Sequence, residues 1–262
     1  MGKALEVIAG GATAPGANFA ELVMGAGNSV NIRSFKPSSS AYIIAMWDWR
    51  NADGNFRVKS PLLHDYVQGI QVYGNAGEIY NYLPQGMVQK IASQDKLTLE
   101  IKGSAAAGQI EQAALFIYYE DLDGANARFI NSNELRLRSK NIVVLENSLT
   151  PGVLGGWSGE AAIAGTYLKA NTNYAVCGFT FSAACLAVGL RGADTSNLRL
   201  ACPGEHNNKE MTANWFIRLS DTLGTSLIPV INSANISNTL LDVMQNQTGT
   251  AVKVSTILVE LS

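Results

Sequence analysis

The sequence of 262 residues is poor in charged side chains, which make up only 15% of it. Soluble domains ordinarily carry about 25%. Much of the surface must therefore be uncharged, either because polar loops cover it or because other subunits bury it. The formal net charge of −2 lacks the basic excess that neutralises phosphates, so we expect no direct sequence-specific binding of nucleic acid.

Long apolar runs and paired cysteines are also missing. No segment has the ~18 consecutive apolar residues of a membrane-spanning helix, and Met1–Glu6 lacks the apolar run of a secretory signal. The three cysteines, Cys177, Cys185 and Cys202, are odd in number, so a full set of disulfides within the chain is excluded. Buried free thiols in a chain made in the cytoplasm are expected.

The short motifs that carry chemistry are absent as well. The sequence has no Gly-x-x-x-x-Gly-Lys-Ser/Thr loop, no His-Glu-x-x-His and no Cys-x-x-Cys, and residues 156–160 do not complete a Gly-x-Ser-x-Gly elbow. We therefore expect no enzyme, no catalytic residue and no cofactor.

What the sequence does contain is a large number of short strand patterns. Leu97, Leu99 and Ile101 alternate with polar residues, and 114–119 is an almost continuous apolar run that fits a strand covered on both sides. Helical periodicity is scarce, and residues 238–246 fit either a short helix or a strand. In the second half, strands are predicted over 174–181, 185–190, 197–201, 215–219, 226–231 and 251–261.

One segment of the first half recurs in the second. With one inserted residue, the stretch from Arg50 to His64 matches the stretch from Arg191 to His206 at seven positions, and the offset is 141 before the insertion and 142 after it. A similar offset of 140 places Ile117–Glu120 on Ile257–Glu260. Besides an alanine, the matched residues are Arg50, Asp53, Asn55, Arg57, Pro61 and His64, on Arg191, Asp194, Asn197, Arg199, Pro203 and His206.

A period of this length is too long for a solenoid repeat and has the size of a small domain. The sequence therefore predicts an all-β protein of two tandem jelly-roll or β-sandwich domains. The expected boundaries are an N-terminal arm over 1–27, a first jelly roll over 28–122, a connector over 123–164 and a second jelly roll over 165–262. The arm is expected because residues 1–27 are rich in alanine and glycine.

We interpret the repeated residues as structural. Asp53 and Asp194 follow apolar strands, where an aspartate accepts hydrogen bonds from nearby backbone N–H groups. Arg57 and Arg199 lie opposite their apolar neighbours, so a stabilising Arg–Asp pair within each domain is expected. His64 and His206 are the only histidines, and we expect a packing or interface role for them, since a metal site needs three or more convergent ligands.

Two further clusters admit two interpretations each. Residues 120–126, with Asp121 and Asp123, gather oxygen donors that fit either a Ca²⁺ site or a solvated turn. A set of aromatic residues fits either a sugar-stacking platform or core packing. These aromatic residues are Trp47, Trp49, Tyr73, Tyr80 and Tyr82.

Two similar β-sandwich modules, a connector, a small-residue arm and no catalytic motif resemble the major capsid proteins of the double-jelly-roll virus lineage. The resemblance is one of architecture over the whole length. It implies a homotrimer of pseudo-hexagonal outline that tiles an icosahedral shell around an internal membrane. It also implies location in the virion after synthesis in the host cytoplasm, with minor capsid or spike proteins as further partners.

Two other classes of function stay open from the sequence. A carbohydrate-binding or spike protein would use the aromatic cluster and polar loops to recognise glycans. A bicupin-like metalloenzyme would use His64 and His206, although the His-x-His pair that cupins place on one strand is absent from both halves.

Overall fold

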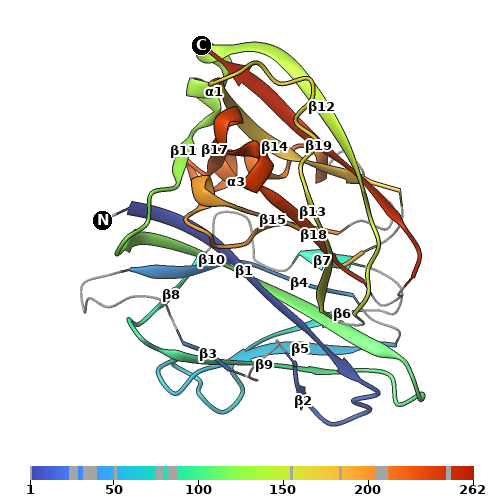
Figure 1. Cartoon of the computed structure of the whole chain (residues 1–262). Coiled ribbons are helices and arrows are strands. Elements are labelled where there is room, and N and C mark those ends of the chain that lie inside the picture. Colours follow the sequence, from blue (N-terminus) through green and yellow to red (C-terminus); the bar gives the residue numbers. More distant parts are fainter. Residues whose placement is uncertain are drawn as a thin grey trace.

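The structure is a computed structural model of the whole chain, and Figure 1 shows the second half of the chain above the first. The structure describes residues 2–23, 29–31, 40–49, 52–74, 79–81, 88–153, 156–182, 185–204, 212–245 and 249–262. Within these ranges, only the backbone is described for residues 29–31, 74 and 79–81.

The first half of the chain forms two antiparallel sheets. The β1 sheet has the order β1-β10-β4-β7, with β8 also paired to β4, and the β2 sheet has the order β2-β9-β5-β6, with β3 also paired to β9. The strands are β1 (Gly2–Thr13), β2 (Ala20–Glu21), β3 (Ser29–Asn31), β4 (Ala41–Trp49), β5 (Gly54–Lys59), β6 (Ile70–Gly74), β7 (Ile79–Asn81), β8 (Gln89–Ile91), β9 (Lys96–Lys102) and β10 (Ile110–Leu122).

The second half repeats this arrangement. The β12 sheet has the order β12-β19-β14-β17-β11, and the β13 sheet has the order β13-β18-β15-β16. The elements are β11 (Arg128–Ile130), α1 (Ser132–Arg138), β12 (Ser139–Leu149), β13 (Trp157–Ala162), β14 (Asn173–Phe181), β15 (Ala187–Arg191), η1 (Ala193–Thr195), β16 (Leu200–Pro203), α3 (Trp215–Leu223), β17 (Ile228–Asn232), η2 (Ser233–Asn238), β18 (Leu240–Met244) and β19 (Val252–Leu261).

Both halves have the strand order of a jelly roll. When β2 with β3, and β7 with β8, each count as one strand, the described residues of the first half form eight strands in chain order; in the second half β12 to β19 are the corresponding eight, and β11 is an additional edge strand beside β17. One sheet joins strands one, eight, three and six, and the other joins two, seven, four and five. The predicted fold class, all-β with two tandem jelly rolls, is therefore confirmed.

A β-bulge also recurs at the same place in both halves. In the first jelly roll, β4 has one extra residue opposite the step from Phe116 to Ile117 of β10. In the second, β14 has one extra residue opposite the step from Ile257 to Leu258 of β19. Bulges are kept as features of a fold, so the shared bulge aligns β10 with β19 residue by residue.

The predicted arm and connector are wrong. Residues 2–13 form β1, which is the first strand of the first jelly roll, and the expected connector contains β12 and β13, the first two strands of the second. The β1 strand carries apolar and small residues on both faces because it packs between two cores. Leu5 and Val7 face the second jelly roll, and Ala4 and Ala12 face the core of the first. A strand buried on both sides does not alternate between polar and apolar residues.

One segment expected as a strand and one part of the expected connector are helices. The stretch expected as a strand over 215–219 begins α3, whose buried Trp215, Phe216 and Leu219 share one face, and Gly224 ends the helix in the left-handed region at a φ of 63°. In the expected connector, Asn131 and Glu134 form a capping box at the start of α1. Residues 238–246, left open between helix and strand, contain β18.

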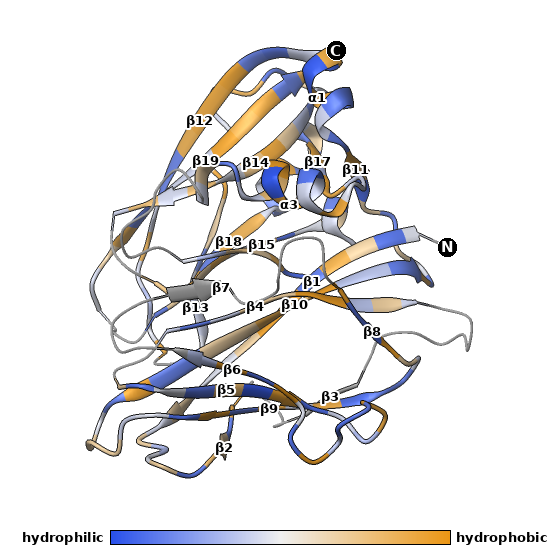
Figure 2. Cartoon of the chain, turned by 180° about the vertical axis from the view of Figure 1, so that it is seen from behind, coloured by the Kyte–Doolittle hydropathy of each residue, from blue (hydrophilic) through white to orange (hydrophobic). Residues whose placement is uncertain are grey.

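The β1 sheet is buried on both faces. One face packs on the β2 sheet, with Leu115 and Ile117 in a core that includes Phe56 and Leu99. The other face contributes Phe116 and further residues to the core of the second jelly roll. Figure 2 shows β1 and β10 between the two halves, with apolar colour along much of their length. The cores therefore share a sheet as their common wall.

All three cysteines are buried thiols, and burial raises the pKa of the Cys177 thiol to about 11. The thiolate is the reactive form. At about pH 8, near the ordinary thiol pKa, we expect a disulfide reagent such as DTNB to label none of them in the folded protein. All three should react in denaturant. A native thiol that reacts as fast as free cysteine would contradict this expectation.

Candidate functional site

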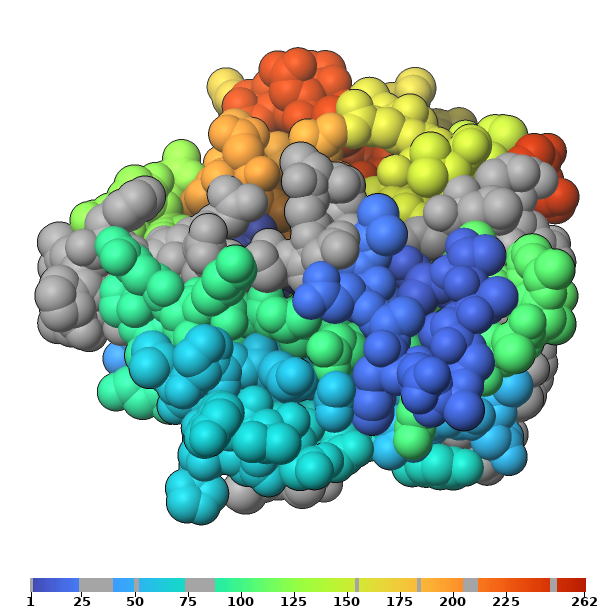
Figure 3. Space-filling model, turned by 90° about the horizontal axis from the view of Figure 1, so that it is seen from below, coloured from blue at the N-terminus to red at the C-terminus, as the bar shows by residue number. Residues whose placement is uncertain are grey.

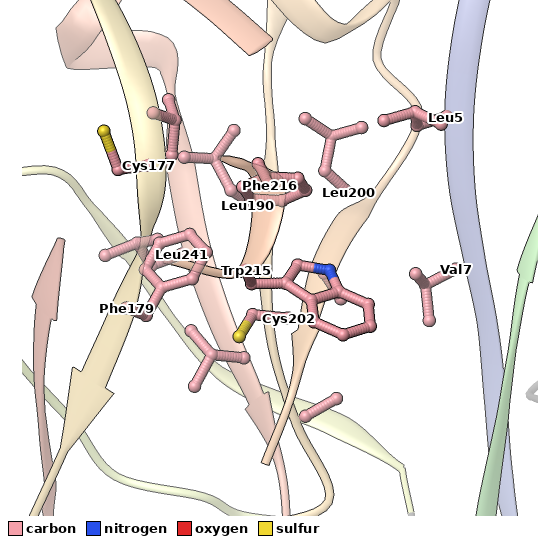
Figure 4. Close-up of a cluster of buried hydrophobic side chains, with 14 of the residues drawn as sticks. Leu5, Val7, Cys177, Phe179, Leu190, Leu200, Cys202, Trp215, Phe216 and Leu241 are labelled. Atoms are coloured by element: carbon pink, nitrogen blue, oxygen red, sulfur yellow. The ribbon is translucent and has the colours of Figure 1, made fainter. Parts of the chain in front are cut away.

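The outer face of the β1 sheet and its edge strand both contact the second jelly roll. The edge strand β16 of the second jelly roll lies beside the edge strand β1 of the first, and the backbone N–H of Val7 donates to the carbonyl oxygen of Arg199 at 2.7 Å. Leu5 and Val7 point from β1 toward Leu200 and Trp215, as Figure 4 shows. This contact joins unlike surfaces of two similar modules.

Aromatic side chains fill the same junction. The ring of Trp215, from α3, lies edge-on to Trp47 at 6.0 Å between centroids and stacks on Phe116 at 6.3 Å. The indole N–H of Trp47 donates to the carbonyl oxygen of Leu186 at 3.1 Å. Trp47 and Phe116 belong to the first jelly roll and the other two residues to the second. The junction is therefore a packed apolar contact that fixes the relative position of the modules.

An arginine cluster lies on the solvent side of the β2 sheet. Arg57, on β5, forms an ion pair with Glu100 of the neighbouring strand β9. The guanidinium carbon also lies 3.7 Å from the centroid of the Phe19 ring, just before β2. Arginine can combine an ion pair with stacking on an aromatic ring. The cluster thus ties together three neighbouring strands of this sheet.

The same kind of cluster recurs on the β13 sheet. Arg199 bonds to Asp242 of β18, at 2.7 Å between Nη2 and Oδ2, and lies 4.8 Å from the ring centroid of Trp157 on β13. The strand between them, β15, has Gly189 opposite Asp242. A Cβ on Gly189 would lie 2.3 Å from Oδ1 of Asp242. The glycine therefore lets Arg199 cross β15 to reach the carboxylate.

Burial affects the proton affinity of this second cluster. The Asp242 side chain is 4% exposed and that of Arg199 is 26% exposed. Burial raises the pKa of Asp242, and the Arg199 guanidinium offsets part of that rise. The buried carboxylate depends on the arginine, because an unpaired buried charge is strongly destabilising.

The residue equivalence drawn from the sequence repeat does not follow the strands. Arg57 lies on β5, the fourth strand of its jelly roll, whereas Arg199 immediately precedes β16, the fifth strand. Asn55 is an extended residue of β5, while Asn197 has a φ of 57° in the loop before β16. The aligned stretches are therefore shifted by one strand, although both arginines reach an acid on strand seven.

Arg57 and Arg199 pair with Glu100 and Asp242 rather than with Asp53 and Asp194. Asp194 accepts hydrogen bonds from the backbone N–H of Asn232 at 2.8 Å and from the side chain of Asn235. Asp53 is exposed in the turn between β4 and β5. Arg191, at the end of β15, pairs with Glu160 of β13.

The remaining repeat residues do not form one site. Pro61 and His64 are exposed in the loop after β5, and Pro203 is buried at the end of β16. Arg50 and His206 lie outside the described residues. Across the ranges described above, no three His, Cys, Asp or Glu side chains cluster as metal ligands, and this holds for the described surroundings of Asp121 and Asp123.

The aromatic residues that fit either a sugar-stacking platform or core packing do not lie together. Trp47 is fully buried at the junction, whereas Tyr73 is 63% exposed on β6, in the other sheet. Trp49 is half-buried on β4. The side chain of Tyr80 and all of Tyr82 lie outside the described parts. A sugar-stacking platform that needs Trp47 beside Tyr73 is therefore excluded.

None of the helices in the described ranges is both long and apolar enough to cross a bilayer.

No protein-family model and no curated protein matches the sequence. Among solved structures, the chain is similar to the PBSX exported protein XepA, with 10% identity and a TM-score of 0.29 over 97% of this chain and 86% of that one. It is similar to the major capsid protein P2 from bacteriophage PM2, with 7% identity and a TM-score of 0.25 over 99% and 98%.

A third similar structure comes from Sulfolobus turreted icosahedral virus, with 9% identity and a TM-score of 0.22 over 92% of this chain and 62% of that one. The fold assignment rests on the strand order and not on these distant likenesses. By that order, the chain is a double jelly roll.

Proposed function

We propose that this chain is a structural virion protein, a major capsid protein that forms trimeric, pseudo-hexameric capsomers of an icosahedral shell. It acts without a catalytic site or a cofactor, and its main partner is its own copy. Minor capsid or spike proteins and an internal membrane are further partners in this proposal.

The observation that carries the proposal is the junction between β1 and β16. One jelly roll contributes its first strand and the other its fifth. A contact between unlike surfaces of like units can repeat around an axis and close into a ring. Three chains with two such units each supply the six members of a pseudo-hexagonal ring.

The composition supports the same proposal. A share of 15% charged residues is low for a protein whose surface stays in water, and surfaces between permanent subunits are less charged than free surfaces. The buried junction also fixes the angle between the jelly rolls, which a regular shell requires.

Size-exclusion chromatography with light scattering tests this function, followed by negative-stain microscopy. We expect a mass three times that of the chain, with further association into sheets or shells. A protein that remains monomeric at high concentration would overturn the proposal. Glycan binding by such a monomer would favour the carbohydrate-binding alternative, and stoichiometric metal lost on His64→Ala would favour the metalloenzyme.

A further inference from the structure

The shared bulge identifies the part of the second jelly roll that corresponds to the junction surface of the first. Because Phe116 and Ile257 occupy the same place beside the bulge, their partners Val7 on β1 and Val144 on β12 correspond as well. By the same register, Leu5 corresponds to Ile142.

These corresponding residues differ sharply in exposure. Leu5 and Val7 are 0% and 3% exposed because the second jelly roll covers them. Ile142 and Val144 are 74% and 56% exposed. We call this surface the β12 patch, which consists of the exposed Ile142 and Val144; their cross-strand neighbours Ile257 and Val259 are half-buried and buried.

A second exposed apolar surface, on the first jelly roll, corresponds to the β16 side of the β1–β16 junction. Within the chain, β1 is met by β16 and the loop before it, where Leu198 and Leu200 are buried. The corresponding strand of the first jelly roll is β6. The β6 patch comprises exposed apolar residues of β6 and the preceding loop, and it consists of Leu62, Tyr66, Val67 and Tyr73, which are 57 to 64% exposed. In Figure 3 the cyan atoms of this region lie on the outside of the first jelly roll.

The bulge and Lys140 precede the β12 patch and Glu146 follows it, so the devices that keep edge strands apart flank the patch without entering it. Edge strands are usually protected by charges, prolines or bulges. The bulge in β12 ends at Ile142, and the following residues as far as Leu145 include neither a charge nor a proline. An apolar edge of this kind is an association surface unless a neighbour covers it.

We propose that the β6 patch of one copy covers the β12 patch of the next copy, in a contact between chains that repeats the β1–β16 junction within the chain. Each copy has one patch of each kind, so the contact runs head to tail, and in the proposed trimer it closes after three copies. This inference rests on the proposed trimer and assigns its surfaces.

The first test is the pair of variants Val144→Lys and Val153→Lys. Val153 is 54% exposed, which matches Val144, but it lies in the loop after β12 and outside the patch. We expect Val144→Lys to reduce the mass from light scattering threefold, to that of one chain, while Val153→Lys remains trimeric. Circular dichroism should show both variants folded. Equal masses for the two variants would overturn the assignment.

The second test is chemical crosslinking through introduced thiols, which the burial of the native cysteines makes selective. A chain with both Val67→Cys and Val144→Cys, treated with a short bis-maleimide, should give a ladder on a denaturing gel that ends at the trimer. Each single variant should give no crosslink. Dimers from Val144→Cys alone would instead show two copies meeting at β12 about a two-fold axis.

The outcomes separate the inference from the function on which it rests. A monomeric wild-type chain overturns both. A wild-type trimer that persists in Val144→Lys and gives no ladder in the double variant overturns the assigned surfaces and leaves the capsid function standing.

Discussion

Trp215→Ala is expected to lower the free energy of unfolding by about 3–5 kcal/mol, which is the usual cost of emptying a large aromatic site in a core. Trp215 is 5% exposed and contacts both Trp47 and Phe116 across the junction. The cavity would therefore open between the two jelly rolls. Urea unfolding followed by circular dichroism measures the loss.

Tyr167→Ala is the matched control, because this aromatic side chain is 81% exposed. Surface truncations of this kind usually change stability by no more than about 0.5 kcal/mol. If the two variants lost similar amounts, the aromatic junction would not be the contact that couples the modules.

Gly189→Ala is expected to cost about 3 kcal/mol, by separating a buried carboxylate from its arginine. The added Cβ would lie 2.3 Å from Oδ1 of Asp242 and 2.9 Å from Cδ of Arg199. The pair cannot keep its geometry without a shift of β15. At the size of this chain, each kcal/mol corresponds to roughly 2–4 °C in melting temperature, so thermal unfolding detects the change.

The loss in Gly189→Ala should depend on pH in a defined direction. Burial already raises the pKa of Asp242, and weakening its contact with Arg199 raises that pKa further. Once the carboxyl group is protonated, it no longer needs the guanidinium. The difference from wild type is therefore full at neutral pH and shrinks as pH falls through the raised pKa.

Gly152→Ala provides the control for Gly189→Ala, because a Cβ at Gly152 meets no atom within 4 Å. We expect its melting temperature to stay close to that of the wild type. A pH-independent loss in Gly189→Ala would mean that backbone crowding, and not the ion pair, causes the effect.

The strands that the sequence predicted correctly are those whose pattern is local. Leu97, Leu99 and Ile101 alternate along β9, and the apolar run 114–119 lies in β10, which is covered on both sides. The β1 strand was missed because its small residues are dictated by two cores that are distant in sequence. The sequence predicts a strand at Trp215 because aromatic residues favour strands, whereas its helix is set by packing.

The arginine clusters could be found only in part. The repeat identifies Arg57 and Arg199. Their acidic partners lie on other strands, which intervening turns separate from the arginines in the sequence. In both modules the acid follows its arginine by 43 residues, so the offset that relates the arginines also relates Glu100 to Asp242. That second match was the available signal. No sequence motif marks Gly189, because its role is to leave room for the Arg199 side chain that crosses β15.

The position of β1 also sets an order of events during synthesis. The strand leaves the ribosome well before the residues near Arg199 and Trp215, which cover its outer face. Until then the nascent first half presents Leu5, Val7 and Phe116 to water, where transiently exposed apolar surface invites aggregation. A chain truncated before β16 should therefore need chaperones to stay dispersed.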